Sequence, residues 1–211
     1  MSFEDRTEAG RRLACRLADL AGTDAVVLGV TRGGVPVAAE LARVLRLPID
    51  VVVARRLADP FRPAVTIGAF AERGVCVTDQ VALHDAGVGP AELAEIKRNV
   101  DLELVQQGQI LRRGGQPLPL AGRTAVIVDD GVATGMTAIA GCRSARLGSA
   151  ERVVLAVAVA TVDAVAALCA EADEVVCVER PMALATLASW YADFPRATDE
   201  HIAAVLRSVA V

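Results

Sequence analysis

The sequence predicts an α/β fold: an open, mostly parallel, twisted sheet with helices on both faces, accompanied by small hood and lid elements. Short apolar, β-branched segments alternate with helical segments along much of the 211-residue chain, as expected for such a sheet. Only 3% of the residues are aromatic, and small and β-branched side chains suit helices that pack closely on a buried parallel sheet. Two glycine-rich loops follow predicted strands, and ligands of these sheets bind beyond the carboxyl ends of the strands.

The first quarter of the chain predicts a helix followed by a strand–helix–strand unit. Apolar residues recur at helical spacing near 5–21. The runs 25–30 and 49–54 have strand length and composition, and a helix is expected between them at 35–45. This order predicts two parallel strands joined by a right-handed crossover.

The pattern loosens between residues 55 and 120, where we expect an insert or lid. A polar, proline-marked stretch precedes two short predicted strands, at 66–70 and 75–78. A polar helix is expected from Pro90 to about Arg113. The lid itself is expected in the loop 57–64 or in part of 80–115.

The strand–helix alternation returns after residue 120. The remaining predicted elements are strands at 123–128, 152–160 and 174–178, helices from about 136 and at 163–171, and a tail helix from about Asp199 with Thr198 as its N-cap. We therefore predict a single domain over residues 1–211. Its parts are a core at about 20–56 and 120–180, a lid or insert at about 57–119, and a C-terminal hood at about 181–211.

The composition excludes several classes of protein. The net charge is −4, and without clustered Lys and Arg we expect no DNA partner. The five cysteines form no CxxC pair and the two histidines stand alone, so a thiolate or imidazole metal site is not expected. The charged N-terminus is not a secretory signal, and no apolar run approaches the ~20 residues of a membrane span. We expect a cytoplasmic protein with reduced thiols.

The segment VIVDDGVATGMT (126–137) combines features that suit a phosphorylated sugar. Its two glycines, Gly131 and Gly135, allow positive φ and a close backbone approach, and the helix that follows adds the positive end of its dipole. Asp129 and Asp130 suit ribose hydroxyls or a hydrated Mg²⁺. The alternative is that the two acids merely favour the dipole of the next helix.

The whole segment resembles the 5-phosphoribosyl-1-pyrophosphate (PRPP) signature of type I phosphoribosyltransferases, in which four hydrophobic residues precede two acids, a short variable stretch and Thr-Gly. The resemblance implies that Asp129 and Asp130 contact the ribose hydroxyls and hold Mg²⁺ directly or through water. It implies that the 5-phosphate is bound by Val132, Ala133, Thr134, Gly135, Met136 and Thr137. Ala133 stands where hypoxanthine-guanine enzymes carry an Asp, so the loop is more similar to the adenine type.

The earlier loop TRGGVP (31–36) is not a GxGxxG dinucleotide motif. It resembles the pyrophosphate loop of the same family, which implies that Thr31, Arg32, Gly33 and Gly34 bind the leaving pyrophosphate. The resemblance also implies a non-proline cis peptide around Thr31–Arg32. The alternative is an ordinary turn in which the glycines serve only geometry.

Arg55 and Arg56 follow the predicted strand 49–54 and resemble the basic pair that contacts pyrophosphate in orotate-type enzymes, where the second residue is commonly Lys. Arginine stays charged and binds oxyanions bidentately. The alternative is a solvated surface pair. The catalytic residues implied by the resemblance are Asp129, Asp130, Arg32, Arg55 and Arg56.

The resemblance extends to a bacterial group of uncharacterised predicted phosphoribosyltransferases, through FEDRTEAGRRLA (3–14) and WYADFPRATDE (190–200). Asp5 and Arg6 either approach the site or cap and brace the first helix, and the structural role is favoured. Trp190, Tyr191 and Phe194 either pack the tail or form a stacking wall for a planar acceptor.

The activity implied by the resemblance is transfer of the 5-phosphoribosyl group of PRPP to a nitrogenous acceptor, such as a nucleobase, with Mg²⁺ and release of pyrophosphate. A homodimer is expected, because dimers are common in this fold. The alternatives are a non-catalytic PRPP- or nucleotide-binding regulator of the same fold and a metal-dependent hydrolase. Glu95 and His84 are the candidates for a general base.

Overall fold

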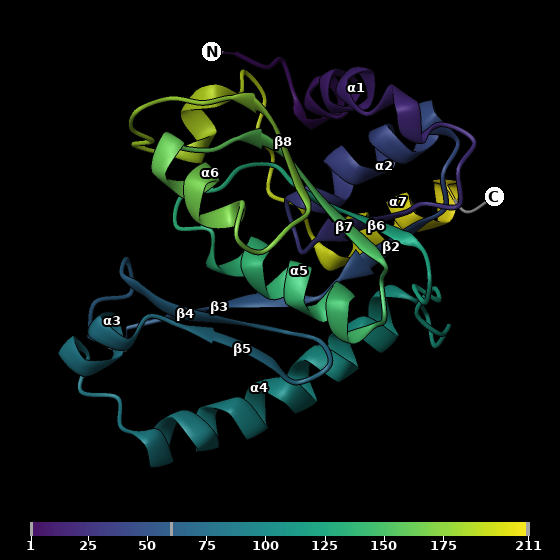
Figure 1. Ribbon diagram of the computed structural model, residues 1–211. Helices are drawn as coiled ribbons and strands as arrows, with labels where there is room; N and C mark the ends of the chain where they lie inside the picture. Colours follow the sequence, from purple (N-terminus) through teal and green to yellow (C-terminus); the bar gives the residue numbers. More distant parts are fainter. Residues whose placement is uncertain (1, 60, 210–211) are drawn as a thin grey trace.

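The computed structural model describes residues 2–59 and 61–209, so residues 1, 60, 210 and 211 of the predicted domain lie outside the described part. Its core is a five-stranded parallel sheet in the order β2-β1-β6-β7-β8 (Figure 1). The strands are β1 (Val26–Val30), β2 (Ile49–Val52), β6 (Thr124–Asp129), β7 (Arg152–Val159) and β8 (Glu174–Glu179). The predicted α/β fold is thereby confirmed.

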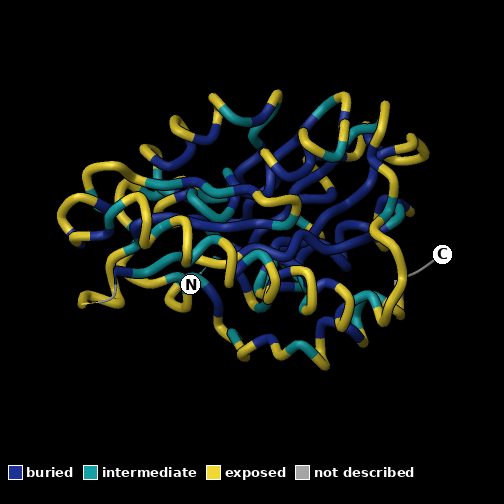
Figure 2. Tube along the Cα trace, turned by 90° about the horizontal axis from the view of Figure 1, so that it is seen from below, coloured by how far each residue is buried: buried dark blue, intermediate teal, exposed yellow. Residues whose placement is uncertain are grey.

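Helices cover both faces of this sheet, which explains why its strands are apolar without a polar alternation. On one face α1 (Arg6–Arg16) and α2 (Gly34–Leu45) pack on residues such as Val126 and Val128. On the other face α5 (Met136–Leu147) and α6 (Val162–Leu168) pack on their neighbours along the strand, Ala125 and Ile127. Figure 2 shows the buried strands as a continuous layer beneath exposed turns.

A second, antiparallel sheet holds the expected insert. It consists of β3 (Ala54–Ala58), β4 (Thr66–Ala71) and β5 (Val75–Thr78), followed by α3 (Gln80–Asp85) and the long α4 (Pro90–Leu111) (Figure 1). The predicted strands at 66–70 and 75–78 and the helix from Pro90 are confirmed. Helix α3 was not predicted.

The prediction of one strand over residues 49–54, directly followed by Arg55 and Arg56, is wrong. Instead β2 ends at Val52 and β3 begins at Ala54, so Arg55 and Arg56 lie on a strand, opposite Phe70 and Ala69. Because both arginines are exposed, this edge strand lacks the apolar pattern that would have revealed it.

The two ends of the chain lie side by side. Phe3 forms a parallel bridge with Tyr191, just after the short 3₁₀ helix η2 (Leu187–Trp190). The tail ends in α7 (Asp199–Val209), and Thr198 caps it as predicted, since the His201 amide donates to Thr198 Oγ1 at 3.2 Å. A further 3₁₀ turn, η1 (Ala18–Leu20), follows α1. Within residues 2–59 and 61–209, no helix is both long and apolar enough to cross a bilayer.

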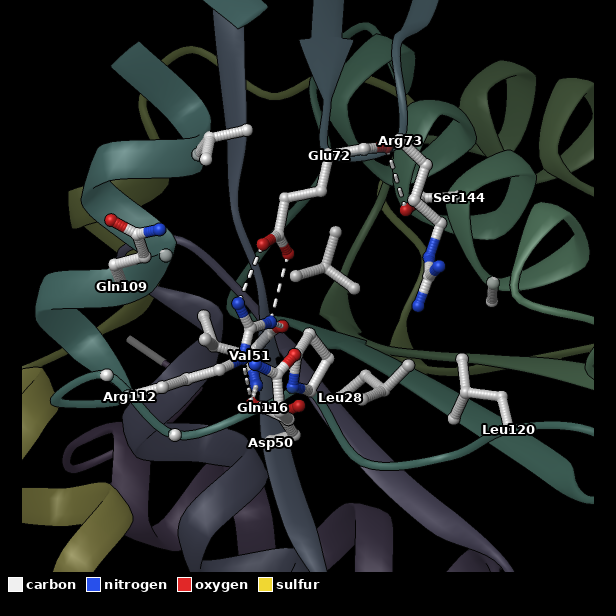
Figure 3. A pocket seen from close by; sticks show the side chains of 17 residues that line it. Leu28, Asp50, Val51, Glu72, Arg73, Gln109, Arg112, Gln116, Leu120 and Ser144 are labelled. Atoms are coloured by element: carbon white, nitrogen blue, oxygen red, sulfur yellow. Dashed lines mark hydrogen bonds and ion pairs between the residues drawn. The ribbon is translucent and has the colours of Figure 1, made fainter. Parts of the chain in front are cut away.

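Arg112, at the C-terminal end of α4, joins the two sheets (Figure 3). Its Nε donates to Asp50 Oδ1 at 2.8 Å, and its Nη1 donates to Glu72 Oε1 at 2.7 Å. Its Nη2 also donates to the Val51 carbonyl at 2.6 Å. Only 9% of the Arg112 side chain is exposed, so this one guanidinium compensates two largely buried carboxylates and fixes the end of α4.

We predict that Arg112→Gln lowers the free energy of unfolding by about 3–5 kcal/mol, because it leaves two buried carboxylates without their cation. Urea titration measures this effect. The matched control is Arg152→Gln, which breaks the half-exposed pair with Glu174 and is expected to cost less than about 1 kcal/mol. Equal losses for the two variants would contradict a structural role for the buried network.

Candidate functional site

A cavity of about 1020 Å³ opens beyond the carboxyl ends of β1 and β6. Its walls come from α1, residues 31–33, β3, α4, the residues after β6 and the C-terminal tail, whereas Gly34 lies outside the lining. It therefore lies where parallel α/β sheets bind their ligands, and the insert and the tail enclose it. Of the residues singled out from the sequence, Thr31, Arg32, Gly33, Arg55, Arg56, Asp129, Asp130, Thr137 and Phe194 all lie on its wall.

Two adjacent carboxylates occupy the inner wall of the cavity. Asp129 ends β6 and Asp130 follows it, and the residues are only 7% and 5% exposed. The Asp130 amide donates to Asp129 Oδ1 at 2.9 Å. Burial raises the pKa of Asp129 well above its ordinary value, and the charge of Asp130 raises it further. Burial also raises the pKa of Asp130, and the positive charge of Arg6 partly offsets that rise.

The loop 31–34 packs directly on this acidic pair. The cis peptide implied for Thr31–Arg32 is present. A Cβ on Gly33 would lie 2.0 Å from Asp130 Oδ2, and one on Gly34 would lie 2.2 Å from the Val128 carbonyl oxygen. The two glycines are therefore needed because loop 31–34 lies so close to residues 128–130. They do more here than shape an ordinary turn.

Internal carboxylates hold two of the three predicted arginines. Arg32 Nε donates to Asp199 Oδ1 at 2.6 Å, and Gln107 Nε2 donates to the same carboxylate at 3.3 Å. This hydrogen bonding from Arg32 lowers the pKa of Asp199, so that carboxylate is charged at neutral pH. Arg55 likewise pairs with Glu103 of α4. Asp199 and Glu103 thus occupy the two arginines that were expected to bind an anionic ligand.

The loop after the acidic pair is only partly arranged as expected. Gly131 and Thr137 line the cavity, and Gly135 adopts the expected positive φ of 82° where α5 begins. The assignment of Val132 to an anion site is wrong, because Val132 is buried and its amide already donates to the Val159 carbonyl at 2.8 Å. The structure leaves Ala133, Thr134, Gly135 and Met136 outside the lining of the cavity.

Of the three aromatic residues proposed as an acceptor wall, Phe194 alone lines the cavity. For Tyr191 the packing alternative is confirmed, because its ring is buried between Phe3 and Phe194, with centroids 5.2 and 4.7 Å away. Its hydroxyl donates to the Asp130 carbonyl at 2.6 Å. Trp190 lies outside the cavity lining and packs on the core beneath the tail.

Several wall residues were missed from the sequence. Asp5 caps α1 by accepting from the Glu8 amide at 2.7 Å, as favoured, but Arg6 instead reaches the cavity and pairs with Asp130. Leu187 packs against Gly131, where a Cβ would lie 2.0 Å from its Cδ1. The other missed residues are Ala54, Glu103, Gln106, Gln107, Ile110, Pro195, Arg196, Ala197 and Asp199. Glu95 and His84 are not on the wall.

The donor set of the cavity suits Mg²⁺ better than a transition metal. Among the described residues, no group of three or more His, Cys, Asp or Glu side chains forms a ready-made cage. Two carboxylates suit a cation that keeps much of its water and takes its remaining ligands from a bound phosphate. Each acid already has one oxygen engaged, since Asp129 Oδ1 accepts from the Asp130 amide and Asp130 Oδ2 accepts from Arg6.

The comparisons with known proteins agree with this geometry. The family model described as "Phosphoribosyl transferase domain" matches residues 4–182. The Mycobacterium tuberculosis H37Rv protein named "Putative phosphoribosyl transferase Rv0571c" is 44% identical over 204 residues, which are 97% of this chain and 46% of that protein. The chain thus spans about half the length of the curated relatives it matches.

Solved structures support the same likeness. The crystal structure of TT1426 from Thermus thermophilus is 38% identical, covers 100% of both chains and superimposes with a TM-score of 0.82. The purine phosphoribosyltransferase from Pyrococcus horikoshii is 16% identical over 93% of this chain and 99% of its own, with a TM-score of 0.50. The second similarity is one of fold.

We predict that Asp199→Asn strengthens binding of inorganic pyrophosphate about two- to five-fold, because it frees Arg32 from a half-exposed ion pair worth roughly 0.2–1 kcal/mol. Titration calorimetry with pyrophosphate at low ionic strength measures the change. Glu200→Gln removes the same charge from the next residue, which does not line the cavity, and is the matched control. Equal or weaker binding by Asp199→Asn would contradict competition at Arg32.

Proposed function

Because the chain belongs to the phosphoribosyl transferase domain family, we propose that it transfers the 5-phosphoribosyl group of PRPP to a nitrogenous acceptor and releases pyrophosphate. One observation carries the proposal: the buried acidic pair, the loop 31–34 and the arginines of β3 meet around a single cavity of about 1020 Å³. The cavity therefore brings carboxylates that can accept from a diol together with arginines that can bind a diphosphate.

In the proposed complex the ribose diol lies against Asp129 and Asp130, which accept hydrogen bonds from its hydroxyls. The diphosphate lies against the amides of Arg32 and Gly33 and the guanidinium groups of Arg32 and Arg55, whereas the Thr31 amide already donates to the Val52 carbonyl. The two arginines exchange Asp199 and Glu103 for phosphate oxygens, to which a guanidinium donates bidentately. Arg56 also lines the cavity and could contribute after giving up its 3.3 Å contact with Thr66 Oγ1.

The 5-phosphate is assigned to the segment Ala133–Thr137 and the start of α5. The exposed residues Ala133 and Thr134 leave their backbone accessible, and the N-terminus of α5 favours an anion. Thr137 adds a side-chain hydroxyl on the cavity wall. Val132 plays no part in this assignment, since its amide is used within the sheet.

The proposed reaction breaks the bond between ribose C1 and the pyrophosphate oxygen, and the electron pair leaves with pyrophosphate. The acceptor nitrogen forms the new bond to C1 and gives up one proton. The protein's part is orientation and stabilisation of the departing negative charge by preorganised guanidinium and amide groups. No described side chain is assigned the proton, since Glu95 and His84 lie outside the cavity lining.

Mg²⁺ is the proposed cofactor. Asp129 and Asp130 would hold it directly or through water, each with the carboxylate oxygen that is not engaged within the protein. When bound, the cation neutralises part of the charge of PRPP. The residues of α4 and of the tail that line the cavity would exclude water around the bound substrate, which assigns the lid to part of 80–115.

The test is release of pyrophosphate from Mg–PRPP with a panel of purine, pyrimidine, pyridine and amine acceptors. Acceptor-dependent release supports the transferase. Binding of PRPP without release under any acceptor points instead to the regulatory alternative of the same fold. Failure to bind PRPP would overturn both.

We predict that Asp130→Asn weakens binding or turnover of PRPP about 10- to 100-fold, since a hydrogen bond to a charged group contributes roughly 1.5–3 kcal/mol. Asp163→Asn, on the exposed first turn of α6, is the matched control and should match the wild type. Calorimetry and initial rates of pyrophosphate release measure both variants. An Asp130→Asn protein with unchanged affinity and turnover would remove Asp130 from the site.

A further inference from the structure

We infer that Arg6 is a positioning residue for the proposed reaction: its guanidinium fixes the Asp130 carboxylate in the orientation that receives the ribose diol. The inference rests on the proposed function and names a residue of the N-terminal helix, 124 positions away from Asp130 in the sequence. It concerns how the acidic pair is held, and assigns no contact between Arg6 and the reacting atoms.

The ion pair between Arg6 and Asp130 is buried in the wall of the cavity. Arg6 Nε donates to Asp130 Oδ2 at 2.8 Å, and the two side chains are only 10% and 8% exposed. Both residues line the cavity. A carboxylate has more acceptor positions than this one bond uses, so Asp130 can accept from a ligand while Arg6 holds it.

Arg6 is itself held rigidly by the tail. Its Nη1 donates to the Pro195 carbonyl at 2.6 Å, and its guanidinium carbon lies 3.8 Å from the centre of the Phe194 ring. A planar guanidinium stacked on an aromatic ring has little freedom to turn. Asp130 is thereby fixed from two sides, because the Tyr191 hydroxyl also binds its carbonyl at 2.6 Å.

The acidic pair needs such a partner for a physical reason. Two adjacent carboxylates in a buried position repel each other and lose hydration, so without a cation both would turn away or take up protons. Among the described residues, Arg6 is the one cation that the structure pairs with either acid. A guanidinium with fixed geometry thus holds one carboxylate of the pair in one orientation.

Arg12 is the matched control that separates positioning of Asp130 from a purely structural role of Arg6. This residue lies on the same helix, its guanidinium carbon is 4.7 Å from the centre of the Phe3 ring, and its Nη2 donates to Glu179 Oε1 at 2.6 Å. Arg12 therefore makes the same kinds of contact between α1 and the rest of the fold, but it does not line the cavity. Loss of Arg12 should destabilise the fold without altering the acidic pair.

The experiment compares Arg6→Gln, Arg6→Lys and Arg12→Gln by melting temperature, by calorimetric Kd for Mg–PRPP, and by kcat and KM for pyrophosphate release. Arg6→Gln is expected to weaken PRPP binding about 10- to 100-fold, and Arg6→Lys should restore part of the affinity. Arg12→Gln should stay within about two-fold of the wild type, although it lowers the melting temperature. In an Asp130→Asn background, Arg6→Gln should cost little more, because the two residues act as a unit.

The inference is overturned if the wild type binds PRPP and Arg6→Gln binds it equally well, or if Arg6→Gln and Asp130→Asn add independently. If Arg6→Gln does not fold, Arg6→Lys decides, and an affinity for PRPP no different from that of Arg12→Gln would contradict the inference. A wild-type protein that binds no PRPP would instead overturn the proposed function, and this outcome is distinct from the others.

Discussion

The rest of the site depends on burying two adjacent carboxylates at the end of the central strand. Asp129 and Asp130 are each less than a tenth exposed, and burial penalises charge unless partners compensate it. The loop 31–34 can approach them only because Gly33 and Gly34 carry no side chain. On the other side Arg6 supplies the compensating charge. The acidic pair therefore determines which residues its neighbours can be.

The same constraint explains why the two ends of the chain meet beside the cavity. Helix α1 presents Arg6 to the acids, and the tail presents Phe194 and Pro195 to Arg6. The bridge between Phe3 and Tyr191 joins these ends, and the Tyr191 hydroxyl returns to the Asp130 backbone. Segments that look peripheral in the sequence thus complete a site whose centre lies on β6. The outer wall, by contrast, consists of half-exposed ion pairs that a ligand can displace.

The core and the two glycine loops could be predicted from the sequence because their signals are local. Buried parallel strands are continuous apolar runs, and the acidic pair followed by Thr134 and Gly135 is a compact motif. The failures share a different cause. Arg55 and Arg56 lie on an edge strand without an apolar pattern, and the Val132 amide is used by β7 across the sheet. The contacts of Arg6 and Tyr191 with Asp130 span many residues, and no local pattern encodes them.

The most direct test of the central claim is a crystal structure of the protein soaked with PRPP and Mg²⁺. The account predicts the ribose hydroxyls against Asp129 and Asp130, the diphosphate against residues 31–34 with Arg32 and Arg55 turned away from Asp199 and Glu103, and the 5-phosphate at 133–137. Density for the ligand away from these residues, or a diphosphate bound while Arg32 and Arg55 keep their internal carboxylates, would contradict it.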